Sequence, residues 1–276
     1  MIVPVRSPVG KVELLTSADA EGGLALSTEA GWNQLMADWN YLLAAGQGFG
    51  VRADGRLIAT SLALPYPPRF GWVSMVLVSQ AYRRRGLATL LLQAAVDRLL
   101  RAGLVPMLDA TPEGRAVYSR LGFVGVEDID RWRGEVAGDG TEGLGRSDFA
   151  QIASIDLSAF GADRLHLLAA LGSRPGSSVL VGDGGYAIVR RGRLASQVGP
   201  VVASTVERGR DLARAILDHT RGAVIADVPR SATDVARDLI DRGFTVQRSF
   251  HRMAYGRSHG LGNTVSVFAT AGPELG

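Results

Sequence analysis

The sequence predicts an α/β (α+β) fold, a mixed sheet flanked by helices, built twice in tandem. Apolar strands alternate with helices that end at glycine, a glycine-rich stretch divides the chain, and the same order of elements recurs after it. The 276 residues are enough for two domains of ordinary size, and the 46% apolar content is enough for a core in each.

In the first half, apolar residues at helical spacing predict an amphipathic helix over residues 28–45. Asp54-Gly55 lies between two β-rich runs and predicts a hairpin, because this dipeptide favours a two-residue turn. The nearly continuous apolar run 72–78 suits a central strand covered on both faces. The expected elements that follow are a helix over 86–102, a strand over 104–110, a helix over 112–121 and a strand from Phe123.

Five glycines between Gly134 and Gly145 predict a linker, which we place at residues 136–146, between domains at 1–135 and 147–276. The segments DATPEGRAVYSRLGFV and ADVPRSATDVARDLIDRGFTV both read as strand, proline, helix and a Gly-Phe stop. An internal duplication explains this better than chance likeness of two αβ units. The second half is expected to have helices over 149–160, 164–171, 207–219 and 232–239 and strands over 178–181, 185–190, 197–203, 223–228 and 264–269.

Composition excludes several classes of function. The chain has no cysteine, so a disulfide framework and a thiolate nucleophile are excluded, and the four histidines have no metal-ligand spacing, so no metal is expected. A net charge of +3 is too small and scattered to predict nucleic-acid binding. No apolar run approaches the length that spans a bilayer and no signal peptide is recognised, so no membrane association and a cytoplasmic location are expected. The sequence does not predict the oligomeric state.

The segment VLVSQAYRRRGLATLL carries the strongest functional signal. A buried strand ends at Val78, and a helix opens after a short loop at Gly86. The backbone N–H groups of a first helical turn have no partners within the helix and attract anions, so this loop suits a pyrophosphate. Gly86 permits close approach, Ala88 keeps the helix start uncluttered, and three arginines add positive charge. The structural alternative is an ordinary strand-to-helix turn with exposed arginines.

The run Arg-Arg-Arg-Gly-Leu-Ala in this loop resembles the Arg/Gln-x-x-Gly-x-Gly/Ala signature of the GNAT superfamily of N-acyltransferases, and the resemblance extends from Trp72 to Phe123. It implies the GNAT fold, acetyl-CoA as cosubstrate and no metal. It also implies that the pantetheine arm pairs with the strand before the loop, which splays at a bulge, and that the pyrophosphate rests on the loop and helix start. The cofactor-binding residues implied are Val76, Leu77, Val78, Arg83, Arg84, Arg85, Gly86, Leu87, Ala88 and Thr89.

Two residues are candidates for acid–base chemistry. Tyr118 matches the tyrosine of the GNAT pattern Tyr-x-x-x-Gly-Phe, which implies that it protonates the departing thiolate; its alternative role is in the core. The glutamate that many GNAT enzymes carry on the splayed strand is missing, since Ser74 and Met75 stand there. Asp109 is the nearest substitute as general base, with capping of the turn before Thr111 as its alternative role and a water relay as another route.

The acceptor cleft of a GNAT domain is lined by its first helices, which points here to the segment EAGWNQLMADWNYLL. Trp32, Asn33, Asp38 and Trp39 are therefore the candidate substrate-binding residues, with Asp38 suited to an ammonium group and an indole to a cation. Their structural alternatives are core positions for the two tryptophans and solvated surface for Asn33 and Asp38.

The second half resembles a degenerate GNAT domain. Its loop at residues 203–208 lacks the glycine pattern, and Leu239 stands opposite Tyr118. The function expected is therefore acetyl-CoA-dependent N-acetylation of a primary amine of a small molecule by direct attack, carried out by the first half. The alternatives are an acyl-CoA sensor without turnover, a protein acceptor, or a tandem transferase whose second half is catalytic.

Overall fold

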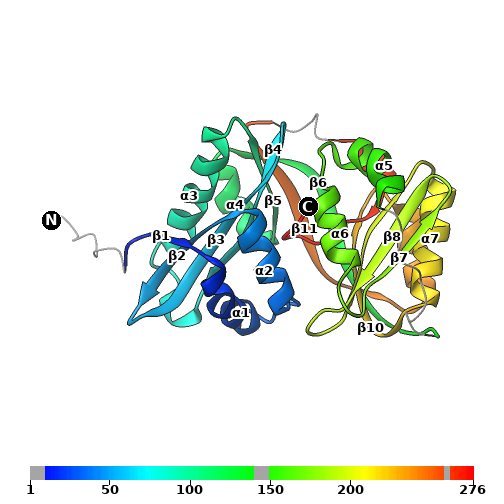
Figure 1. Cartoon of the computed structure of the whole chain (residues 1–276), viewed down its shortest axis with the longest axis horizontal. Helices are drawn as coiled ribbons and strands as arrows, with labels where there is room; N and C mark the ends of the chain where they lie inside the picture. The colour runs from blue at the N-terminus through cyan, green and yellow to red at the C-terminus, as the bar shows by residue number, and fades with distance from the viewer. Residues whose placement is uncertain (1–9, 140–148, 258–261) are drawn as a thin grey trace.

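The computed structural model describes residues 10–139, 149–257 and 262–276. Within these residues twelve strands form one sheet, in the order β1-β2-β3-β4-β5-β11-β6-β10-β9-β8-β7, with β12 paired to β9 (Figure 1). The α/β class and the mixed sheet flanked by helices are confirmed. None of the described helices is long and apolar enough to cross a membrane.

The elements of the first half follow the expected order, with two additions at its start. They are β1 (Glu13–Leu15), α1 (Ala20–Glu29), α2 (Met36–Ala45), β2 (Gln47–Ala53), β3 (Arg56–Tyr66), β4 (Phe70–Val78), η2 (Gln80–Tyr82), α3 (Leu87–Arg101), β5 (Val105–Ala110), α4 (Pro112–Arg120) and β6 (Phe123–Ala137). The hairpin turn is confirmed, since Asp54 and Gly55 both have positive φ, of 50° and 75°.

The second half repeats the order helices, strands, helix, strand, helix, strand. Its elements are α5 (Ala150–Phe160), α6 (Leu165–Gly172), β7 (Ser178–Gly182), β8 (Gly185–Arg190), β9 (Ser196–Ala203), α7 (Val206–Asp218), β10 (Arg221–Pro229), α8 (Thr233–Asp241), β11 (Thr245–Tyr255), η3 (Thr264–Ser266) and β12 (Val267–Ala269). Strand β11 was not expected from the sequence, and it is the longest strand of this half.

The single helix predicted over residues 28–45 is wrong in its extent. The chain forms two helices, α1 and α2, separated by residues 30–35. Gly31 takes a left-handed φ of 72°, and a carboxylate oxygen of Asp38 accepts the N–H of Leu35 at 2.7 Å, which starts α2 anew. The break sends the loop with Trp32, Asn33 and Gln34 toward the second half.

The two halves exchange their last strands. Strand β11 of the second half pairs with β5 of the first, while β6 of the first half pairs with β10 of the second; β6 and β11 pair with each other along most of their length. The two strands therefore form the centre of the sheet, as Figure 1 shows between the blue-to-green and yellow-to-orange halves. The expected linker region begins within β6, which runs to Ala137; residues 140–148 lie outside the described part of the chain.

Apolar side chains fill both faces of the sheet. Helices α1, α2, α5 and α6 share one core that includes Trp39, Tyr66, Phe160 and Tyr186, so this core joins the two halves. On the other face, α3 covers the first half, and α7 and α8 cover the second. Because one core and two central strands belong to both halves, residues from the second half are held firmly beside the first.

Candidate active site

A slot opens in the sheet between β4 and β5. The strands pair in parallel only from Phe70 to Trp72, opposite residues 105–107, and β4 then diverges. The cause is a bulge at Met75, which has a positive φ of 51° and lies where the pairing of β4 with β3 shifts register. Beyond the bulge, Val76, Leu77 and Val78 face β5 across a gap instead of a hydrogen-bonded ladder. The splay that the family resemblance implied is present.

The start of α3, at the end of this slot, has the backbone geometry of an anion site. Its first intrahelical bond runs from the N–H of Leu90 to the carbonyl of Gly86, so the N–H groups of the preceding turn have no partner within the helix. Arg84 and Gly86 have left-handed φ of 60° and 82°, a conformation that makes a concave arrangement of N–H groups. Side chains at Arg83–Gly86 and Ala88–Thr89 are exposed, while Leu87 is buried and anchors the helix.

Gly86 suits this site for two reasons. Its φ is one that L side chains rarely adopt, and a Cβ built on it meets no atom within 4 Å. The space beside the helix start is therefore open to a ligand. Glu29 at the end of α1 holds the loop by accepting the N–H of Gln80 at 2.7 Å. These features fit the pyrophosphate of acetyl-CoA.

A cavity of about 200 Å³ continues from the slot into the junction of the halves. Its inner wall comes from the first half, and its outer wall includes β11 and the segment 270–276. The lining residues are Trp32, Gln34, Val73, Ser74, Met75, Val76, Leu108, Asp109, Thr111, Tyr118, Arg131, Arg248, Phe250, Pro273 and Glu274.

Tyr118 reaches the cavity from the last turn of α4. The Thr111 hydroxyl caps this helix by accepting the N–H of Gly114 at 3.3 Å, and the Tyr118 ring packs against Phe123. Burial raises the pKa of the Tyr118 phenol above its usual value, so the group is protonated at neutral pH. A neutral phenol in this place is able to donate a proton.

Asp109 also lines the cavity, but both of its oxygens are engaged. Arg252 on β11 donates Nε and Nη2 to them at 2.9 Å each, and the guanidinium lies over the Trp72 ring. Burial raises the pKa of Asp109, and the charge of Arg252 opposes that rise. Because both Asp109 oxygens bond Arg252 and the start of α4 is capped by Thr111, the capping role suggested for Asp109 is wrong.

Of the four acceptor candidates, only Trp32 lines the cavity of about 200 Å³. The Asn33 side chain bonds the loop of the second half, accepting from the N–H of Leu194 at 2.8 Å and donating to the carbonyl of Ala195 at 3.0 Å. Asp38 pairs with Arg174 besides starting α2. Trp39 is 0% exposed, and its indole N–H donates to Ser27. These three side chains therefore position the loop that carries Trp32 and Gln34.

The cavity residues that were not expected from the sequence include Arg131 on β6, Arg248 and Phe250 on β11, and Glu274. Only the strand pattern of residues 245–255 could have drawn attention to β11, and nothing in the sequence marks Glu274. The first half fixes the segment 270–276: Trp72 donates to the carbonyl of Pro273 and Tyr66 to that of Leu275, each at 2.8 Å.

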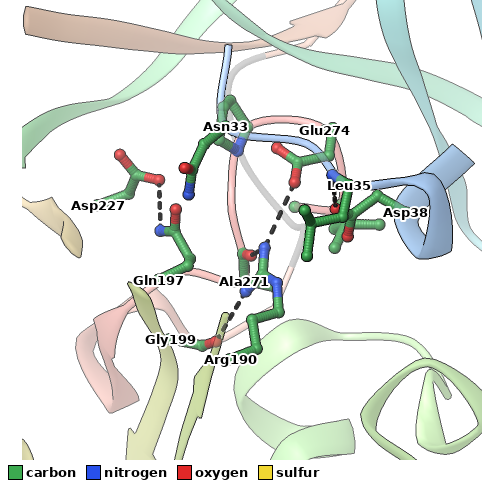
Figure 2. A network of polar contacts seen from close by, with 12 residues as sticks. Asn33, Leu35, Asp38, Arg190, Gln197, Gly199, Asp227, Ala271 and Glu274 are labelled. Atoms are coloured by element: carbon green, nitrogen blue, oxygen red, sulfur yellow. Dashed lines mark hydrogen bonds and ion pairs between the residues drawn. The ribbon is translucent and has the colours of Figure 1, made fainter. Parts of the chain in front are cut away.

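Arg190 of β8 supports Glu274 from the second half. Its Nη2 donates to the carbonyl of Ala271 at 2.7 Å and to the Glu274 carboxylate at 3.3 Å, while Nη1 reaches the carbonyl of Gly199 (Figure 2). Burial raises the pKa of Glu274, and Arg190 opposes that rise. Glu274 is thus a buried carboxylate that has one side-chain partner, Arg190, within the described residues.

The corresponding slot of the second half is filled. Strand β12 pairs with β9 at Val201 and Val202, and the N–H of Thr270 donates to the carbonyl of Asp227 on β10 at 2.8 Å. The chain itself thus occupies the gap between β9 and β10. The start of α7 is also satisfied, because the Thr205 hydroxyl accepts the N–H of Arg208 at 3.3 Å and Glu207 follows in the first turn. An anion would be repelled there.

In the first half, the sheet opens at a bulge beside a helix that follows a glycine and has no side-chain cap. The second half repeats this architecture in altered form. Together these features define a tandem N-acetyltransferase fold of the GNAT type. Residues 16–123 match the acetyltransferase (GNAT) family, and residues 152–269 match an acetyltransferase (GNAT) domain. The chain therefore carries two GNAT domains in tandem.

Known proteins of similar sequence and structure agree. Over 236 residues the chain is 25% identical to the uncharacterized N-acetyltransferase YitH of Bacillus subtilis. This alignment covers 81% of this chain and 83% of YitH. A Pyrococcus horikoshii structure, named as that of a putative acetyltransferase, has a TM-score of 0.79 at 19% identity and covers 97% of this chain and 96% of its own. A tandem GNAT protein from the clavulanic acid biosynthesis pathway has a TM-score of 0.57 at 16% identity, with 91% and 100% covered.

The filled second slot predicts one CoA per chain. Calorimetric titration should give a stoichiometry of one, and Gly86→Val should weaken the Kd at least tenfold, about 1.4 kcal/mol, because a branched side chain would stand where the pyrophosphate approaches. Gly103→Val is the matched control, since Gly103 lies just beyond the other end of α3 with a φ of 72° and equally open space. Two molecules bound per chain, or equal effects of the two substitutions, would contradict the assignment.

Proposed function

We propose that the chain is an acetyl-CoA-dependent N-acetyltransferase that acetylates a primary amine of a small molecule by direct attack. The observation that carries the proposal is the open slot beyond Met75, which leads from the uncapped start of α3 to a cavity lined by Tyr118. The filled slot of the second half supports placing the chemistry in the first.

Each part of the first half has a task in this proposal. The turn at Arg84–Thr89 holds the pyrophosphate, and the edge of β4 at Val76–Val78 lies along the pantetheine arm. Tyr118 then gives its phenol proton to the sulfur as the C–N bond forms and the C–S bond breaks. The nitrogen loses its surplus protons to a carboxylate or ordered water and through solvent to the tyrosine, so that CoA leaves as a thiol.

The small size of the cavity supports a small acceptor. About 200 Å³ is shared between the reacting end of the thioester and the amine, and the loop carrying Trp32 and the segment 270–276 cover it from two sides. A folded protein would have to present a thin extended segment to reach Tyr118. We infer a cytoplasmic site of action. We also infer that this chemistry needs no bound metal.

The test is release of free CoA from acetyl-CoA over a panel of small primary amines, with a lysine-containing peptide included. Turnover of at least one small amine, faster than of the peptide, is the expected result. Binding of CoA without turnover of any acceptor would favour the acyl-CoA sensor, and preference for the peptide would favour a protein acceptor. Either outcome would overturn the proposal.

A further inference from the structure

Charged side chains on the central strands beside the cavity lie in two rows, and Asp109, Arg131 and Arg248 among them line the cavity itself. In one row, Asp109 of β5, Arg252 of β11 and Glu127 of β6 are direct partners in register. In the other, Arg248 of β11, Arg131 of β6 and Asp227 of β10 are direct partners. The first row has two acids for one base, and the second has two bases for one acid.

A bulge in β11 creates the second row. The pairing of β11 with β6 shifts between Val246 and Arg248, so Gln247 is an extra residue in the strand. Without that shift, Arg248 would be opposite Asp130, on the other face of the sheet. The bulge instead places Arg248 directly opposite Arg131, and like charges in that position repel. The two neighbouring arginines repel each other, and an anion bound beside them would offset this repulsion.

The existing acid of this row is already committed to Arg131. Asp227 accepts Nε and Nη2 of Arg131 at 2.7 and 2.8 Å, and the amide of Gln197 at 3.0 Å, as Figure 2 shows in part. The Arg248 side chain makes no hydrogen bond or ion pair within the described residues, although it lines the cavity and is only partly exposed. Burial, and after it the charge of Arg131, lowers the pKa of Arg248.

A negative group stands in the same cavity on the segment 270–276. Glu274 is 6% exposed, and its carboxylate has only the 3.3 Å contact with Arg190 among side chains of the described residues. Two further polar atoms of the lining, Gln34 Oε1 and Ser74 Oγ, are buried without a partner in that part of the chain. Buried polar groups are normally satisfied, so these atoms indicate a polar ligand.

From these charges we propose that the acceptor is a small amine that also carries an anionic group such as a carboxylate, held by Arg248 and presenting its ammonium group to Glu274. The inference rests on the proposed acetyltransferase function. Glu274 takes the surplus proton of the ammonium group, and the amine nitrogen bonds to the acetyl carbon. Tyr118 protonates the sulfur that leaves, and the second nitrogen proton restores the phenol through solvent. One proton remains on Glu274 for release.

The second half thereby acquires a function in spite of its closed slot. Arg248, Phe250 and Glu274 all come from it, and Phe250 lies between the two charged rows, with the Arg131 guanidinium 5.2 Å from its ring centroid. The first half activates the acetyl group, and the second half selects the molecule that receives it.

The experiment compares matched acceptors on the full chain: L-phenylalanine with 2-phenylethylamine, L-lysine with cadaverine, and L-glutamine with 4-aminobutyramide. We expect kcat/KM of the parent protein to favour the amino acids. Arg248→Gln should lower it about 10- to 100-fold for the amino acids, the value of a charge-assisted hydrogen bond, while leaving the partners without an α-carboxylate unchanged. Arg133→Gln, an exposed position on β6 two residues from Arg131, is the control and should change neither.

Glu274→Gln distinguishes recognition of the ammonium group from recognition of the carboxylate. Because every acceptor has the ammonium group, this substitution should lower kcat for both members of every pair. Unfolding temperature and the Kd for CoA are measured for each variant, so that a folding defect or a CoA contact of Arg248 is detected. Equal kcat/KM for both members of the pairs in the parent protein overturns the inference while leaving the acetyltransferase intact. An Arg248→Gln effect that is equal for both members, or that appears in the CoA Kd, also overturns it. If the protein acetylates none of these amines, the proposed function itself is contradicted.

Discussion

Tyr118→Phe should lower kcat by about 10²-fold or more while the KM for acetyl-CoA changes little, because general-acid help of this kind is worth about 10²- to 10⁴-fold. The phenol is needed when the sulfur takes on negative charge, not when the thioester binds. The ring remains in the variant, so its packing against Phe123 is kept. Steady-state kinetics with a saturating amine, combined with a burst experiment to show that chemistry limits the rate, measures the effect.

Tyr255→Phe is the matched control for this substitution. Tyr255 packs edge-on against the same Phe123 ring and does not line the cavity. Because Tyr255 does not line the cavity, removal of its hydroxyl should leave kcat unchanged. Equal kcat for the Tyr118 variant and the parent protein would exclude the phenol as general acid and return Tyr118 to a packing role.

Asp109→Asn is expected to destabilise the chain by about 3 kcal/mol. The substitution leaves the Arg252 guanidinium buried without its fork partner, and breaking one side of a buried pair costs about 3–5 kcal/mol. We expect the low end of that range, because Glu127 is the direct neighbour of Arg252 on its other side. Urea unfolding measures the change in the free energy of unfolding.

The exposed pair of Arg237 and Asp234 on α8 provides the comparison. Asp234→Asn breaks an exposed ion pair and should cost at most about 1 kcal/mol. If Asp109 were the general base, its variant would instead lose kcat by about 10²-fold in protein that remains as stable as the parent. That result would also weaken the assignment of Glu274 as the proton acceptor.

The elements around the CoA slot could be predicted because their signals are local. Asp54-Gly55 requires a tight turn, and Gly86 after three arginines marks a helix start, whatever the rest of the chain does. The break between α1 and α2 was missed, because apolar residues in the loop continued the helical spacing. Asp38, predicted to bind the substrate and with solvated surface as its alternative, ends that continuity by accepting the N–H of Leu35.

The outer wall of the cavity could not be predicted, because it depends on pairing between distant strands. Arg252 meets Asp109 across 143 residues, and Arg131 meets Asp227 across 96. No local pattern shows that β11 lies between β5 and β6, nor that a one-residue bulge turns Arg248 to the cavity. The residues proposed to bind the cosubstrate follow from a local pattern, whereas Arg131, Arg248 and Glu274 reach the cavity only through long-range pairing and packing.

The exchange of β6 and β11 ties acceptor recognition to the folding of the whole chain. Neither half has a complete sheet alone, so the chain should unfold in one cooperative transition, and a fragment ending near Glu135 would lose the strand that pairs with β5. Substitutions that shift β11 within the sheet would alter the choice of acceptor while the start of α3 stays as it is.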